Sequence, residues 1–143
     1  MDKPLTLKSN RTLQITYNLP ISRTSKFWEG LKEGKIYATK CEKCGRLHFP
    51  PVADCGECGS SNMKWIELDG EGEIETFTQV VVKPASFSKE SSYIVAIARL
   101  KEGVKALAWL IGVEREDVEV GMKVRLVARV TSDGRVAYEF VPI

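Results

Sequence analysis

The sequence has little of the residue types on which enzymes most often depend. It contains one histidine, His48, and its only cysteines are the four of two C-x2-C pairs. General acid–base catalysis uses histidine most often, and nucleophilic catalysis needs an activated serine, cysteine or lysine. Because His48 lies between the two cysteine pairs, we interpret it as an exposed spacer and not as a catalyst. The composition therefore disfavours an independent enzyme.

Long apolar runs are also missing. There is no stretch of about 18 apolar residues, so no transmembrane helix is expected. The N-terminal residues 1–5 lack the apolar stretch of a signal peptide. Paired C-x2-C motifs without a secretion signal are typical of a reducing compartment. We therefore expect a cytoplasmic protein.

Charge of one sign does not dominate the chain, whose net charge is +2 over 143 residues. Residues 1–40 carry eight basic and three acidic side chains, a net charge of +5, whereas residues 67–143 carry ten basic and thirteen acidic ones, a net charge of −3. An acidic surface is unfavourable for tracking the polyanionic backbone of a nucleic acid. The length suits one domain, or a small module attached to one.

The cysteines that are present form a metal-binding pattern. Two C-x2-C pairs are separated by ten residues and comprise Cys41, Cys44, Cys55 and Cys58. This spacing matches a four-cysteine zinc site, although four thiolates also suit iron, and two disulfides are the other alternative. Gly45 and Gly59 follow the second cysteine of each pair, where a metal knuckle needs positive-φ backbone. We predict one structural zinc ion per chain.

The N-terminal part of the chain divides into an extension and a helix. Residues 1–20 are predicted to be an extension in which apolar residues alternate over 13–17, as in a short strand. A helix over 23–33 follows, with Thr24 or Ser25 as N-cap. A helix this short needs something to pack on, either another module or a partner protein. One possible docking surface is its apolar face, made of Phe27, Trp28 and Leu31.

The remaining sequence predicts a mainly β fold in two parts. Residues 21–68 contain the helix and the ribbon that carries the cysteines, flanked by strands at 36–40 and 63–68. Residues 69–143 predict five strands, at 73–83, 93–100, 104–111, 124–130 and 136–141. Five strands with a helical interruption after the third favour an OB-fold barrel, with an SH3-like barrel as the main competitor. We expect this barrel to have a core of its own, so that losing one thiolate would loosen only the ribbon.

These parts, in this order, resemble a known family. The resemblance rests on the helical segment 27–37, on the cysteine finger with Phe49-Pro50-Pro51 at its centre, and on a strand reading Gly72-x-Ile74-x-Thr76-Phe77-Thr78. From about residue 22 to the C-terminus, the chain is similar to small zinc-ribbon/OB-fold proteins associated with acyl-CoA metabolism, which accompany thiolases in archaea and bacteria. The resemblance implies an N-terminal helix and a rubredoxin-like zinc ribbon followed by a five-stranded OB-fold barrel.

The resemblance also implies a function. It indicates a non-catalytic subunit that binds acyl-CoA, or that holds a thiolase against a second enzyme such as a hydroxymethylglutaryl-CoA synthase. The four cysteines carry over as zinc ligands, whereas no CoA-binding residue carries over. Basic side chains beside the helix can either approach CoA phosphates or simply solvate one helix face: Arg23, Lys26 and Lys32.

Binding of single-stranded nucleic acid remains the alternative, because OB-folds stack bases on aromatic rings in a basic groove. The candidate rings are Phe77, Phe87, Tyr93, Trp109, Tyr138 and Phe140.

Overall fold

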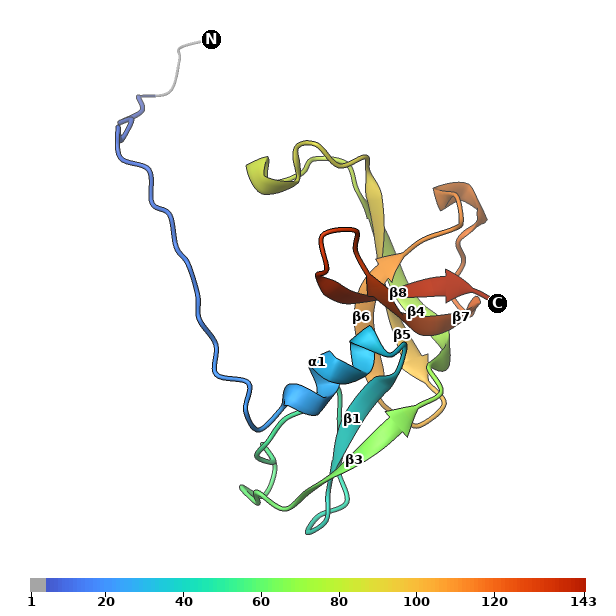
Figure 1. Cartoon of the computed structure of the whole chain (residues 1–143). Helices are drawn as coiled ribbons and strands as arrows, with labels where there is room; N and C mark the ends of the chain where they lie inside the picture. Colours follow the sequence, from blue (N-terminus) through green and yellow to red (C-terminus); the bar gives the residue numbers. More distant parts are fainter. Residues whose placement is uncertain (1–4) are drawn as a thin grey trace.

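Apart from one helix and two short 3-10 turns, the regular structure of the protein is β-sheet (Figure 1). The computed structural model describes residues 5–143, so that the first four residues of the predicted extension lie outside the described part. The elements are α1 (Ser25–Lys32), β1 (Ile36–Cys41), β2 (Leu47–His48), β3 (Met63–Leu68), β4 (Glu71–Val80), a 3-10 turn (Ala85–Phe87), β5 (Tyr93–Leu100), β6 (Lys105–Leu110), a second 3-10 turn (Arg115–Asp117), β7 (Lys123–Val130) and β8 (Val136–Pro142). No helix in the described part of the chain is long and apolar enough to cross a membrane.

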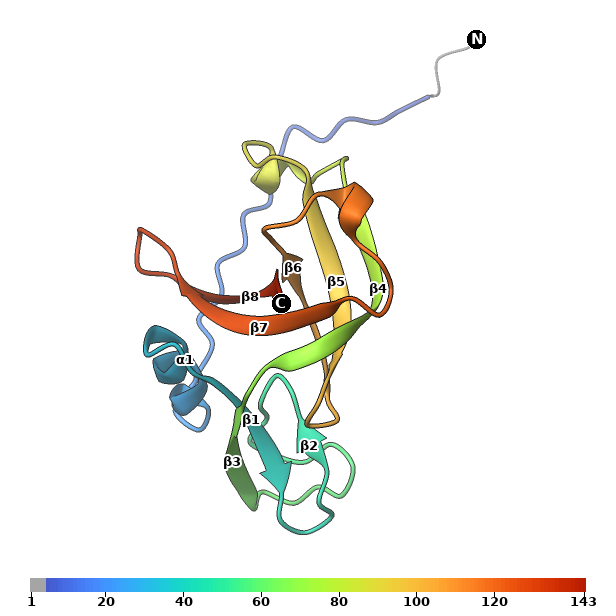
Figure 2. The same cartoon turned by 90° about the vertical axis from the view of Figure 1, so that its right-hand side faces the viewer.

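The first three strands form a small antiparallel sheet in the order β2-β1-β3. β1 and β3 pair over six residues, from Ile36 opposite Leu68 to Cys41 opposite Met63. β2 adds only two rungs, which is too short to leave a periodic pattern in the sequence, and it was not predicted. This sheet carries the cysteines away from the barrel, at the far end of β1 and β3 (Figure 2).

The other five strands form a closed barrel in the order β4-β5-β6-β8-β7. All its pairs are antiparallel except β6 with β8, where Trp109 lies opposite Glu139 and Leu110 opposite Phe140. A short helical turn, Arg115–Asp117, separates the third barrel strand from the fourth. This is an OB-fold, and it confirms the predicted fold class over the SH3-like alternative.

The first barrel strand differs from its prediction in one respect. Alternation along the sequence predicts one common face for Ile74, Thr76, Thr78 and Val80. The pairing of β4 with β5 instead shifts between Ile74 and Thr76, which leaves Glu75 as the extra residue of a β-bulge. A bulge reverses the inward and outward alternation beyond it. Phe77 therefore packs against the core, while Thr76 and Thr78 are exposed.

The junction between ribbon and barrel depends on a glycine. Gly70 has a φ of +86°, and a Cβ atom added there would lie 2.5 Å from the carbonyl oxygen of Leu126 in β7. The N–H of Leu126 donates to the carbonyl of Gly70 at 2.8 Å. Any side chain at position 70 would force this backbone contact apart, so the glycine sets how closely the ribbon's exit strand approaches the barrel.

One apolar core runs from the helix through the ribbon into the barrel. Phe27 and Leu31 of α1 are 3% and 1% exposed and belong to the same buried cluster as Ala38 of β1 and Phe140 of β8. The helix contacts β1, β7 and β8, and it lies between the ribbon and the barrel (Figure 1). The expectation that the helix packs on another module is thus confirmed. The expectation of a separate barrel core is wrong.

The proposed docking face of the helix is corrected by this packing. Phe27 and Leu31 are covered by the protein itself, and of the three apolar residues only Trp28 reaches the surface, with 38% exposure. A binding surface made of all three side chains is therefore wrong.

The predicted strand at 13–17 is also wrong for the isolated chain. Residues 5–20 form no regular secondary structure and extend away from the body (Figures 1 and 2). A strand needs a neighbouring strand for its backbone hydrogen bonds, and no strand lies beside this segment. We call residues 5–21 the N-terminal arm.

Candidate metal centre

Two knuckles of the same build hold the four cysteines. In the first, the N–H of Cys41 donates to the carbonyl of Arg46 and the N–H of Gly45 donates to the carbonyl of Cys41, both at 2.8 Å. The second knuckle repeats the two bonds at 2.8 and 2.9 Å, with Cys55, Ser60 and Gly59 in the corresponding places. The two glycines have φ values of +78° and +72°, as the knuckle turn requires.

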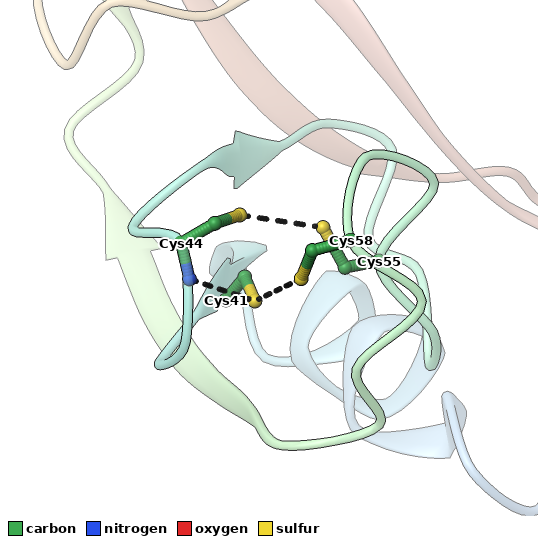
Figure 3. A group of neighbouring side chains, drawn as sticks. All are labelled: Cys41, Cys44, Cys55 and Cys58. Atoms are coloured by element: carbon green, nitrogen blue, oxygen red, sulfur yellow. Dashed lines mark hydrogen bonds between the residues drawn. The ribbon is translucent and has the colours of Figure 1, made fainter.

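The knuckles bring the four predicted sulfur atoms together (Figure 3). Sγ of Cys41 is 3.5 Å from Sγ of Cys58, Sγ of Cys44 is 3.6 Å from Sγ of Cys55, and all four lie within 4.8 Å of one another. A disulfide would need a separation of about 2.0 Å, so these thiols are free. Zinc–sulfur bonds of about 2.3 Å in a tetrahedron place the sulfurs about 3.8 Å apart, which this arrangement fits.

The thiols also show the electrostatics of a cation site. The backbone N–H of Cys44 donates to Sγ of Cys41 at 3.4 Å and is the main reason why the pKa of Cys41 falls to about 6. Although the backbone N–H of Arg46 lowers it, burial and the sulfurs of Cys41, Cys55 and Cys58 raise the pKa of Cys44 to about 11. Four crowded thiols cannot all ionise unless a cation compensates their charge.

His48 does not lie where the sequence analysis expected it. It is half-buried on β2, and its Nε2 atom is 3.3 Å from Sγ of Cys55. An Nε2–H group in this place donates a hydrogen bond to the thiolate, so His48 supports the cysteine and is not an exposed spacer. Two-residue pairing between β1 and β2 causes this contact, and the sequence carries no signal for it.

The basic residues beside α1 are not arranged as a phosphate site. Arg23 donates from Nη1 and Nη2 to the two carboxylate oxygens of Asp54, at 3.0 and 2.7 Å, and so ties the base of the N-terminal arm to the ribbon. Lys26 lies over the ring of Tyr37, 4.9 Å from its centroid, and Lys32 is exposed. Arg23 is therefore occupied, and the three side chains do not converge on one ligand.

The Arg23–Asp54 pair gives the ribbon a measurable acid dependence. Hydrogen bonds from Arg23 and then Ser61 lower the pKa of Asp54 to about 2. A carboxyl whose pKa is lower in the folded state stabilises the fold above its unfolded pKa, and that contribution is lost as the pH falls from about 4 to about 2. We expect Arg23→Gln to raise the pKa of Asp54 toward about 4. A carbon-13 titration of the carboxyl resonance measures this, with Arg11→Gln in the arm as control. An unchanged Asp54 titration in Arg23→Gln would contradict the pairing.

A second surface feature lies on the barrel. Three rings cluster where the loop after β4 meets β5 and β6: Tyr93 and Trp109 stack at 4.2 Å, and Phe87 lies 6.0 and 6.1 Å from them. Phe87 and Trp109 line a groove of about 740 Å³ between β6 and β8. The other candidate rings lie elsewhere, since Phe140 is fully buried, Phe77 lies under Arg115, and Tyr138 packs its ring on those of Phe27 and Phe49.

The charges of this groove do not suit a polyanion. Its lining carries two basic side chains against three acidic ones, Glu90, Asp133 and Glu139. Both arginines are already paired, Arg129 with Glu139 at 3.1 Å and Arg135 with Asp133 at 2.8 Å. A groove that tracks nucleic acid needs unpaired positive charge.

A four-cysteine ribbon joined through one core to a five-stranded barrel defines the protein as a zinc-ribbon/OB-fold protein. Comparison with known families agrees with the structure. Residues 28–64 match the rubredoxin-like zinc ribbon domain of ChsH2, and residues 65–129 match its C-terminal OB-fold domain. A DUF35 domain-containing scaffold protein of Methanocaldococcus jannaschii is 31% identical over 137 residues, which cover 90% of this chain and 97% of that protein. The chain belongs to the DUF35 family of scaffold proteins, and the resemblance noted in the sequence is confirmed.

Two further relatives carry enzyme names. A solved structure described as an Ltp2-ChsH2(DUF35) aldolase contains a chain that is 25% identical to this one, with a TM-score of 0.73, and the match covers 90% of this chain and 98% of that chain. A probable enoyl-CoA hydratase alpha subunit of Thermomonospora curvata is 32% identical over 107 residues, which cover 74% of this chain and 33% of that subunit.

Proposed function

We propose that this chain is a non-catalytic, cytoplasmic subunit that binds a thiolase-type enzyme and helps to hold an acyl-CoA. The observation that carries the proposal is the similarity along 90% of the chain to a component of an Ltp2-ChsH2(DUF35) aldolase. The same module forms a third of a probable enoyl-CoA hydratase subunit. A unit that occurs both as a separate chain and fused within an enzyme subunit is typical of a scaffold that positions catalytic partners.

The polar interior of the protein supports a non-catalytic role. Within residues 5–143, the buried polar side chains are Thr39 and Glu139. Thr39 Oγ1 donates to the carbonyl of Val52 at 3.0 Å and accepts from its N–H at 2.9 Å, which fixes the cysteine finger to β1. Glu139 pairs with Arg129. Both side chains are thus used within the fold, and the four cysteines surround the candidate metal site.

The proposed metal is one structural zinc ion per chain. Four thiolates fill a tetrahedral shell and leave no open position for a water or a substrate. The ion would therefore hold the two knuckles together and would take no part in chemistry. Iron fits the same donors, and elemental analysis of purified protein distinguishes the two metals.

The test of the proposed function mixes the purified protein with the thiolase-type enzyme of the same organism. We expect co-elution in size-exclusion chromatography with light scattering, and a change in acyl-CoA turnover by the enzyme. A hydroxymethylglutaryl-CoA synthase, the proposed second partner, is added in a parallel experiment. Absence of co-elution and of any effect on turnover, together with absence of CoA binding to the isolated chain by calorimetry, would contradict the proposal.

Binding of single-stranded nucleic acid is the alternative function. The stacked pair Tyr93 and Trp109 on an OB-fold favours it, because bases stack on such rings. The paired arginines and the acidic excess of the groove oppose it. We therefore rank it below the scaffold function.

A further inference from the structure

The N-terminal arm concentrates apolar surface that the protein itself does not cover. Fifteen large hydrophobic side chains are exposed in the described part of the chain, and seven of them lie within residues 5–21. Leu13, Tyr17 and Leu19 are 83%, 73% and 76% exposed. An apolar concentration of this kind on a short segment marks an interaction site.

The apolar residues of the arm recur at every second position from Leu13 to Ile21, as Leu13, Ile15, Tyr17, Leu19 and Ile21. The intervening residues are Gln14, Thr16, Asn18 and Pro20. In an extended chain a period of two places all five apolar side chains on one face and the polar ones on the other. Pro20 has no N–H to donate, so the pattern fits a pairing strand over about residues 13–19.

The protein offers this strand no sheet of its own. The barrel is closed, and the strand pairings of the described residues do not include the arm. Between residues 5 and 20 the hydrogen bond that the arm makes is internal, from the N–H of Arg11 to Oγ of Ser9 at 3.2 Å. At its base the arm is fixed, because Arg23 is paired with Asp54 of the ribbon. The arm therefore leaves the body at a fixed point, with its backbone groups unpaired.

We propose that residues 13–19 become a strand when the protein binds its partner enzyme, by adding to an exposed sheet edge of that enzyme. This inference rests on the proposed function and names the surface that performs it. Added strands of this kind gain affinity from main-chain hydrogen bonds and specificity from alternate side chains. The sequence from Lys3 to Trp28 contains five basic residues and no acidic one, so the receiving edge is flanked by acidic side chains.

The experiment compares two double variants of the full chain that differ only in the face they change. Ile15→Ser with Tyr17→Ser removes two apolar side chains, whereas Gln14→Ser with Thr16→Ser changes the opposite face. Affinity for the thiolase-type enzyme is measured by calorimetry. We expect the first pair to weaken binding by about tenfold or more, because two buried side chains are lost. The second pair should change affinity less than about twofold. Both should melt like the parent, since the arm does not pack on the body.

Amide hydrogen exchange gives the signature of strand addition. In the complex we expect protection of every second amide between residues 13 and 19, because alternate N–H groups of a strand point to the same edge. Equal affinity of both double variants for the enzyme would overturn the inference while leaving the proposed function intact. Failure of the parent chain to bind would overturn both. A dimer of this chain that is lost with Ile15→Ser and Tyr17→Ser, with unchanged enzyme binding, would assign the arm to a second copy and also overturn it.

Discussion

Replacing Cys41 with serine is expected to destabilise the whole protein and not only the ribbon. Cys41 ends β1, whose residues Ile36 and Ala38 belong to the same buried cluster as the barrel interior. Structural zinc contributes about 10–16 kcal/mol to the folding of small metal modules, and domain stabilities are only about 5–15 kcal/mol. We expect a loss of about 5 kcal/mol or more, and a fall in Tm of about 15 °C or more. Circular dichroism melts and metal content by elemental analysis measure the two effects.

The matched control for this variant is Lys43→Ser, in the same knuckle. Lys43 is exposed and supplies no sulfur to the site, so metal content and Tm should stay at the parent values. An NMR spectrum of Cys41→Ser in which the barrel resonances keep their positions would contradict the shared core. A red iron chromophore in protein grown with zinc available would contradict the choice of metal.

Phe27→Ala is expected to have the second largest effect. The Phe27 ring lies 6.1 Å from the ring of Phe49 in the cysteine finger and 6.0 Å from that of Tyr138 in β8, so that one side chain joins ribbon and barrel. Truncating a buried phenylalanine costs about 3–5 kcal/mol through lost burial and the cavity left behind. Urea unfolding measures this loss, which should appear as a lower midpoint at a similar slope.

Trp28→Ala provides the comparison one residue further along α1. Because Trp28 is partly exposed, its truncation should cost about 1 kcal/mol or less. Equal destabilisation by the two variants would contradict the packing of the helix. A separate urea transition for the ribbon in the parent protein would contradict the single core.

The sequence allowed prediction of those features that are set by residues close together in the chain. The cysteine spacing and the two knuckle glycines predicted which four thiols meet, because each C-x2-C turn is local. Glycine-marked turns predicted the hairpins, and Gly103 and Gly134 have the positive φ values that such turns require. Strand existence followed from alternation, and the predicted ends were within about three residues of the observed ones.

Features that depend on contacts distant in the sequence could not be predicted. The bulge at Glu75 is invisible in a sequence whose flanking threonines suit either face of a sheet. The contact of His48 with Cys55 depends on two rungs between β1 and β2. The helix pattern predicted an apolar face, but only the structure shows that this face is covered by β1, β7 and β8. Alternation in the arm predicted a strand where the isolated chain has no neighbour to pair with.

The unequal seams of the barrel have a consequence for how the molecule opens. β4 and β5 share eight rungs and β7 and β8 share seven, whereas β4 and β7 share three and β6 and β8 only two. The short seams separate the β4-β5-β6 meander from the β7–β8 hairpin, which is the part of the barrel that α1 contacts. Local opening follows the weakest contacts. The last hairpin should therefore fluctuate together with the zinc ribbon, far from it in sequence, while the meander that precedes it moves as a separate unit.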